Sequence, residues 1–247
     1  MNVLLNGANG GMGKEIIKAI DENDNFTIVC GIDREEGNNG FPIYSDFKDI
    51  TENIDVIIDF SVPVATMKVL EYARSKKIPA VIATTGLSKE QEDAIKEAAN
   101  EIPIFRSANM SLDINLMADI VQKVAEVLND SDIEIIETHH NRKIDSPSGT
   151  AILLADAINK VFNERKKYNF ERMQKREKRD KNEIGFSSVR GGNIVGEHSV
   201  MFFGADESLE IKHTAYSRQV FAKGALKAAE FLVEKEPGLY NMDYLVK

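Results

Sequence analysis

The chain has 247 residues, a formal net charge of −9 and a single cysteine, Cys30. This length is enough for one large domain or two modest ones, each with its own hydrophobic core. The acidic balance disfavours a nucleic-acid-binding role, because phosphate contacts need clustered positive charge. A single cysteine excludes an internal disulfide and a thiolate metal cluster.

The sequence also gives no sign of a membrane or metal partner. No apolar run approaches the roughly 20 residues of a membrane span, and the chain enters a predicted strand at Asn2 without a signal peptide. We therefore expect a cytoplasmic protein. No metal-ligand cluster is apparent, and we interpret the isolated histidines on predicted strands, His198 and His213, as structural.

The N-terminal segment has the strand, glycine-rich turn and helix of a dinucleotide-binding site, in that order. A short apolar strand over 2–6 runs into a glycine-rich turn, and a helix with apolar spacing follows over 14–20. In such sites the backbone approaches a pyrophosphate over the helix N-terminus, where glycine leaves room. The second predicted strand, 26–32, ends at Asp33, where a carboxylate can meet the adenosine ribose hydroxyls.

Arg34 follows Asp33, and the two residues favour different cofactors. A carboxylate accepts hydrogen bonds from the free ribose of NADH, whereas a guanidinium can pair with the extra phosphate of NADPH. We expect both cofactors to be accepted, and the sequence leaves the preference open. The alternative is that Arg34 is a solvated loop charge.

The remaining N-terminal elements predict a doubly wound fold. Strands at 54–60, 78–83 and 102–106 alternate with helices at 64–75 and 88–99, the latter with a capping box of Ser88 and Gln91. This α/β alternation predicts a Rossmann-type doubly wound parallel sheet with a ligand crevice at the carboxyl ends of its strands. We predict a dinucleotide-binding domain over 1–109, completed by the helical segment in 218–247.

The predicted second domain, 110–217, begins with a helix over 112–128. Its strands are expected at 133–138, 184–190, 198–203 and 209–215. This pattern predicts an α+β domain with an open mixed sheet, to which we assign substrate binding and oligomerisation. The segment 164–183 is basic, and we interpret it as a solvated helix end and loop, with a partner-binding patch as the alternative.

The stretch 134–150, EIIETHHNRKIDSPSGT, carries the densest set of reactive side chains. His139, His140 and Lys143 follow a predicted strand, and Ser148 is a plausible N-cap for the apolar-periodic segment beyond it. The first N–H groups of that helix can hold a carboxylate, and histidine and lysine can exchange a proton. We interpret the stretch as an anion site beside a proton-transfer site. The alternative is an ordinary loop and helix cap.

The sequence ETHHNRKIDSPSGTA closely resembles the signature of the dihydrodipicolinate reductase family, E-x-H-H-x-x-K-x-D-x-P-S-G-T-A. The likeness extends to segments 7–13, 83–86, 107–111 and 184–198. It implies that His139 donates or accepts a proton and that Lys143 is an acid. The residues implied to hold the substrate carboxylate are His140, Ser148, Gly149 and Thr150. The residues implied to contact the cofactor are Gly7, Ala8, Asn9, Gly10, Gly11, Met12, Asp33, Arg34, Ala83, Thr84, Thr85, Ser107, Ala108, Asn109 and Met110.

The chain departs from the family pattern at Gly11, where the family has arginine or lysine, and at Ala83, where it has glycine. The resemblance implies NAD(P)H-dependent reduction of 4-hydroxy-tetrahydrodipicolinate, a small dicarboxylate, to tetrahydrodipicolinate with loss of water, in lysine and diaminopimelate biosynthesis. It also implies a homotetramer built through the second-domain sheet.

Two other functions are compatible with the fold. One is another two-domain amino-acid dehydrogenase, such as an aspartate dehydrogenase, and the HHxxK pattern before SGT argues against it. The other is a dinucleotide-sensing binding protein that has lost the chemistry. The presence of both His139 and Lys143 argues against the sensor, because a sensor needs no proton donors.

Overall fold

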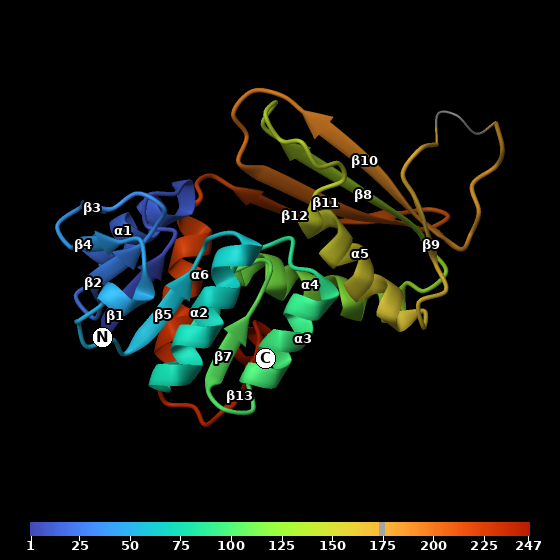
Figure 1. The fold of residues 1–247 in the computed structure, drawn as a ribbon. Helices are drawn as coiled ribbons and strands as arrows, with labels where there is room; N and C mark the ends of the chain where they lie inside the picture. Colours follow the sequence, from blue (N-terminus) through green and yellow to red (C-terminus); the bar gives the residue numbers. More distant parts are fainter. Residues whose placement is uncertain (173–175) are drawn as a thin grey trace. The chain divides into compact units, whose positions relative to one another are not determined.

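The computed structural model describes residues 1–172 and 176–247, which form two compact units (Figure 1). Unit 1 is built from Met1–Leu112 and Arg218–Lys247, and unit 2 from Asp113–Ser217. Unit 2 is therefore an insertion in the chain of unit 1. Within the described residues, no helix is both long enough and apolar enough to cross a membrane.

Unit 1 contains an eight-stranded sheet with the order β13-β7-β6-β5-β1-β2-β4-β3. Its strands are β1 (Asn2–Asn6), β2 (Thr27–Ile32), β3 (Gly37–Asn38), β4 (Pro42–Tyr44), β5 (Val56–Asp59), β6 (Ala80–Ile82), β7 (Pro103–Arg106) and β13 (Gly238–Tyr240). The pairings are parallel except between β3 and β4. The predicted doubly wound sheet is confirmed. Its strand order reverses between β1 and β5, where such folds form their ligand crevice.

Both faces of this sheet are covered, which explains its runs of valine and isoleucine. Helices α1 (Gly11–Asp21) and α6 (Gln219–Leu232) pack on one face, and α2 (Pro63–Lys76) and α3 (Lys89–Ala98) pack on the other. The short helices η1 (Phe47–Asp49) and α7 (Asp243–Val246) complete the unit. Ser88 and Gln91 form the predicted capping box at the start of α3.

Unit 2 contains a five-stranded mixed sheet, as predicted, with the order β12-β11-β8-β10-β9. The strands are β8 (Asp132–His139), β9 (Lys167–Asn169), β10 (Glu183–Arg190), β11 (Gly196–Phe203) and β12 (Ser208–Ala215). Strand β8 pairs parallel with β10 and antiparallel with β11. Helices α4 (Leu112–Val127) and α5 (Gly149–Val161) cover one face of this sheet. The opposite face exposes Ile136, Val189 and Phe203.

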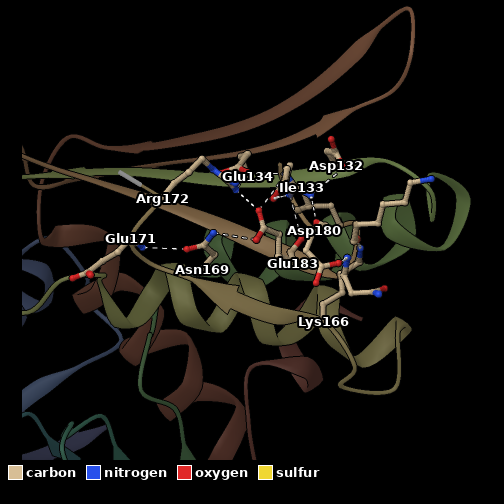
Figure 2. A network of polar contacts seen from close by, with 12 residues as sticks. Asp132, Ile133, Glu134, Lys166, Asn169, Glu171, Arg172, Asp180 and Glu183 are labelled. Atoms are coloured by element: carbon tan, nitrogen blue, oxygen red, sulfur yellow. Dashed lines mark hydrogen bonds and ion pairs between the residues drawn. The ribbon is translucent and has the colours of Figure 1, made fainter. Parts of the chain in front are cut away.

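A network of ion pairs surrounds the start of β10 and joins the chain before it to β8 (Figure 2). Arg179 donates to Asp132 over 3.0 Å and to Glu134 over 3.1 Å. Arg172 pairs with Glu134 at 3.2 Å and with Glu183. These pairs hold the chain before β10 against β8 and β10.

The solvated-loop interpretation of segment 164–183 is wrong for Arg179, whose side chain is only 18% exposed, whereas Arg172 is exposed. It is also wrong for Lys166, which is buried and donates to the carbonyl of Lys181 over 3.0 Å. The partners Asp132 and Glu134 of Arg179 lie on β8, so these contacts cannot be recognised from local composition. Residues 173–175 of the segment lie outside the described part of the chain.

Candidate active site

The amino end of α5 has the geometry of an anion site. Ser148 is its N-cap, as predicted, and the Ser148 Oγ accepts a hydrogen bond from the Ala151 N–H at 3.1 Å. Gly149 and Thr150 occupy the first turn, where the helix dipole attracts negative charge. Nothing lies within 4 Å of the position that a Cβ on Gly149 would take, so a ligand can approach the backbone closely.

His139, the last residue of β8, is held by a buried carboxylate. Its Nδ1 lies 2.5 Å from Glu137 Oε2, and Arg190 donates to both oxygens of Glu137, over 2.7 and 2.8 Å. Burial alone would raise the pKa of Glu137, but hydrogen bonds from His139, Arg190 and Ser188 outweigh it and hold this pKa well below its usual range. Glu137 is therefore ionised inside the unit.

His198 is part of the same cluster, so its interpretation as an isolated histidine is wrong. Its Nε2 lies 2.9 Å from Ser148 Oγ, and its ring centroid is 5.1 Å from that of His139. Burial, followed by the neighbouring His139, lowers the pKa of His198 to about 3. Strand pairing places His198 opposite Glu137, across β8 and β11. His198 is therefore a neutral side chain that supports the start of α5.

Lys143 lies in the loop between β8 and α5. Its Nζ is 2.8 Å from Asp145 Oδ1, and its N–H donates to the His140 carbonyl over 3.1 Å. Burial would raise the pKa of Asp145, but the hydrogen bond and charge of Lys143 lower it. The His140 N–H in turn donates to the Ile194 carbonyl over 2.8 Å. The predicted proton-transfer and carboxylate-binding residues thus all lie between the end of β8 and the first turn of α5.

The glycine-rich turn of unit 1 has the close contacts expected of a nucleotide loop. Gly7 has a φ of 84°, and a Cβ there would lie 2.7 Å from the Phe60 carbonyl oxygen. A Cβ on Gly13 would lie 2.3 Å from the Gly7 carbonyl oxygen. Gly10 is the N-cap of α1 and supplies no side-chain cap. The backbone at this helix end thus fits a pyrophosphate, with Ala8 buried and Met12 partly buried below it.

Gly11, the first residue of α1, has a cation beside it. An Arg218 Nη1 lies 3.5 Å from the position that a Cβ on Gly11 would take. The Arg218 residue is the N-cap of α6. A positive charge is therefore present at this helix end although position 11 itself has no side chain.

Asp33 ties the end of β2 to the glycine-rich turn. Its Oδ2 accepts from the Asn9 N–H over 2.8 Å, and its Oδ1 accepts from the Arg34 N–H over 2.7 Å. Asn9 and Arg34 are both exposed. A carboxylate acceptor and a guanidinium are therefore available at the same strand end.

The segment after β6 is anchored by a buried carboxylate that the sequence did not single out. Thr84 Oγ1 donates to Asp59 Oδ2 over 3.0 Å, and Asp59 also accepts from Asn6 Nδ2 over 2.8 Å. Ala83 and Thr84 are buried, whereas Thr85 is exposed. Asp59 therefore joins the carboxyl ends of β1, β5 and β6 at the expected crevice.

The segment after β7 is held by its own side chains. Ser107 Oγ donates to the Asn109 carbonyl over 2.7 Å, and Asn109 Oδ1 accepts from the Ser111 N–H over 2.9 Å. Met110 is buried in the core, while Ala108 is exposed. We therefore expect Met110 to contribute backbone rather than side-chain contacts to a ligand.

Sequence reasoning did not single out Asp59, Glu137 or Arg190, and it took His198 as isolated although it correctly took that histidine as structural. Glu137 and Arg190 both stand inside the segments that carry the family likeness, so a signal was present. Their pairing was not visible, because β8 and β10 are separated in the chain by α5 and β9.

Comparison with protein families places both units in one group. Residues 1–110 match the model described as dihydrodipicolinate reductase, N-terminus, and residues 113–246 match dihydrodipicolinate reductase, C-terminus. A 4-hydroxy-tetrahydrodipicolinate reductase of Caldanaerobacter subterraneus subsp. tengcongensis is 51% identical, over 100% of this chain and 98% of the relative. The enzyme of the same name from Clostridium novyi is 46% identical, over 99% of this chain and 98% of the relative.

Solved structures support the same fold. A dipicolinate-bound dihydrodipicolinate reductase from a Paenisporosarcina species has a TM-score of 0.81 at 23% identity, covering 98% of this chain and 97% of its own. An aspartate dehydrogenase from Thermotoga maritima has a TM-score of 0.52 at 15% identity, covering 96% and 97%. At these identities the likeness concerns the fold alone.

Proposed function

This chain belongs to the dihydrodipicolinate reductase family, and from that membership we propose that it reduces 4-hydroxy-tetrahydrodipicolinate to tetrahydrodipicolinate, with loss of water. The members of this family are NAD(P)H oxidoreductases of lysine and diaminopimelate biosynthesis. The observation that supports the proposal within the molecule is that Glu137 contacts both His139 and the Ser148 N–H at the start of α5, while Arg190 joins Glu137 to the Asp145 carbonyl in the loop of Lys143. We assign nucleotide binding to unit 1 and substrate binding to unit 2.

The proposed carboxylate site consists of His140, Ser148, Gly149 and Thr150. The positive end of the α5 dipole attracts a carboxylate, and the open space beside Gly149 admits it to the backbone. A substrate carboxylate can compete with Asp145 for Lys143, whose Nζ lies 2.8 Å from Asp145 Oδ1. A dicarboxylate therefore suits the site.

The proposed reaction needs a proton donor in unit 2, where we place the substrate. Loss of water from the substrate would leave a conjugated imine, and a nicotinamide held by unit 1 would supply a hydride to the ring carbon that bore the hydroxyl group. Electron density then moves toward the ring nitrogen, and the neighbouring carbon takes a proton. His139 and Lys143 are placed to stabilise that density and to deliver the proton. The buried surroundings of His139 exclude water and strengthen these interactions.

We propose that the cofactor, NADH or NADPH, lies on the glycine-rich turn over Gly7–Met12. The other proposed contacts are Asp33, Arg34, Ala83, Thr84, Thr85, Ser107, Ala108, Asn109 and Met110. Asp33 suits the free ribose of NADH, and Arg34 suits the extra phosphate of NADPH. We propose that both nucleotides are accepted, and Michaelis constants measured for NADH and NADPH side by side test this. A preference above about a hundredfold for either nucleotide would contradict it.

The decisive test is oxidation of NADH or NADPH by the purified protein, with substrate made in place from pyruvate and aspartate semialdehyde by the preceding synthase. We expect oxidation that requires the synthase product. Lys143→Ala should lower turnover at least ~100-fold if Lys143 is an acid. Lys160→Ala, which removes an exposed lysine at the end of α5, is the matched control and should leave turnover unchanged.

Two results would contradict the proposal. Turnover unaffected by Lys143→Ala would exclude the acid role of that residue. An absence of oxidation by protein that still binds either nucleotide would favour a dinucleotide sensor of the same fold.

We also propose a homotetramer in the cytoplasm, where both nucleotides are available in reduced form. The uncovered face of the unit 2 sheet supports the assembly, because it exposes Ile136, Val189 and Phe203 to solvent in the single chain.

A further inference from the structure

We propose that Glu137 and Arg190 are positioning residues: Glu137 fixes the tautomer of His139, and the pair joins the three segments that carry the proposed reactive groups. The claim that Glu137 fixes the tautomer of His139 can be tested on the folded protein without any catalysis. The catalytic part rests on the proposed function of His139.

Glu137 is a shared acceptor for several parts of the site. Its side chain is only 1% exposed. Its Oε2 lies 2.5 Å from His139 Nδ1, and its Oε1 accepts from the Ser148 N–H over 3.2 Å. The same carboxylate therefore contacts the end of β8 and the residue that caps α5.

The contact defines which nitrogen of His139 carries hydrogen in the neutral ring. An ionised carboxylate only accepts hydrogen bonds, so Nδ1 must be the donor to Glu137. Nε2 is then the nitrogen without hydrogen in the neutral ring. It is the atom of His139 that can gain and lose a proton toward a substrate.

A glycine of β11 lies beside His139 Nε2. A Cβ on Gly196, the first residue of β11, would lie 3.0 Å from His139 Nε2. Any larger residue would crowd that nitrogen. The backbone of β11 therefore leaves space at the nitrogen that the tautomer makes available.

Arg190 extends the same arrangement to the loop of Lys143. Besides binding both Glu137 oxygens, its Nη2 donates to the Asp145 carbonyl over 2.7 Å. Asp145 in turn holds the Lys143 ammonium. Arg190 also balances a carboxylate whose burial without a partner would be costly. The histidine, the lysine loop and the amino end of α5 are thus linked through one ion pair.

The test is to read the tautomer of His139 directly by ¹⁵N NMR of histidine-labelled protein. The chain has four histidines, so the spectrum is simple, and the His139 signals are those lost in His139→Asn. The spectrum is recorded over a range of pH, and the tautomer is read from the signals of the neutral ring. We expect hydrogen on Nδ1 in the wild type.

Glu137→Gln should reverse the tautomer. Arg190 Nη2 and the Ser148 N–H both donate to Oε1, so the amide oxygen of the new glutamine takes that position and its NH₂ group lies beside His139. Nδ1 must then accept, and hydrogen moves to Nε2. Glu134→Gln is the matched control. It changes a carboxylate on the same strand that also binds arginines, and it should leave the His139 signals in place.

The kinetic readout separates positioning from a general loss of structure. For Glu137→Gln we expect kcat to fall by about 100-fold or more, while the KM for the nucleotide stays within about threefold. A reversed tautomer with unchanged turnover would overturn the catalytic part of the proposal.

Two NMR results would overturn the assignment of hydrogen to Nδ1 of His139. Hydrogen on Nε2 in the wild type would overturn the assignment, and this spectrum decides the question even if Glu137→Gln does not fold. An unchanged tautomer in folded Glu137→Gln would overturn it as well. If the wild type has the expected tautomer but reduces no substrate, the proposed function fails while the role of Glu137 in holding His139 stands.

Discussion

Burial has opposite outcomes for two neighbouring side chains of unit 2. Glu137 and His198 face each other across β8 and β11, and both are almost fully buried. Desolvation favours the neutral form of each. Glu137 stays ionised because several donors converge on it, whereas His198 lies beside another histidine and stays neutral. The neighbouring groups, and not the degree of burial, therefore decide whether each of these two side chains is charged.

The lowered pKa of His198 predicts that acid destabilises the protein. Its folded value of about 3 lies below the ~6.5 of an unfolded histidine, so the unfolded chain takes up a proton first. Stability is therefore complete above about pH 6.5 and is lost as the pH falls toward the folded value. From pH 6.5 to 5 we expect this group to remove roughly 1–2 kcal/mol.

Urea unfolding of the wild type and of His198→Gln at both pH values measures this effect. The variant has no imidazole at position 198 and should lose less stability on acidification, whatever its stability at pH 6.5. Equal losses in the two proteins would show that His198 does not titrate as expected.

At the scale of elements, α6 depends on a glycine where it meets the segment after β7. A Cβ on Gly224 would lie 1.7 Å from the Met110 carbonyl oxygen. No rotamer relieves a clash with backbone, so the helix or the segment must shift. Gly224 therefore sets the closest approach of α6 to a segment that we assign to cofactor binding.

Gly224→Ala should destabilise the protein by about 1–3 kcal/mol, the usual range for overpacking, and should also raise the KM for the nucleotide. Gly37→Ala is the matched control, since nothing lies within 4 Å of that Cβ position, and it should change stability by less than about 0.5 kcal/mol. Denaturant unfolding gives both values. A tolerated Gly224→Ala would mean that α6 adjusts freely at this contact.

Most of the longer elements and the site motif were predictable from sequence, because periodicity, caps and turns are local signals. The capping box of α3 and the N-cap Ser148 were found this way. The short strands β3, β4, β9 and β13 were not, since they have two or three residues and, unlike β6, do not lie in a longer apolar run. The insertion of β8 between β10 and β11 is a long-range pairing, and so are the contacts of Glu137 with Arg190 and His198.

At the scale of the whole molecule, the uncovered face of the unit 2 sheet predicts assembly. Sedimentation velocity should give a tetramer of about 110 kDa, four times the 27.6 kDa of one chain. Val189→Lys places a charge on that face and should shift the population toward smaller species. Val127→Lys, at an exposed valine that ends α4, is the control. A monomeric wild type, or equal effects of both variants, would contradict assembly through this face.

The discontinuous chain of unit 1 has a consequence for synthesis on the ribosome. β7 gains its outer partner β13, and the sheet gains α6 on one face, from Arg218–Lys247, which is translated last. A nascent chain that stalls before residue 218 therefore presents an open strand edge and an uncovered apolar face, the features that chaperones bind and that aggregate when left exposed.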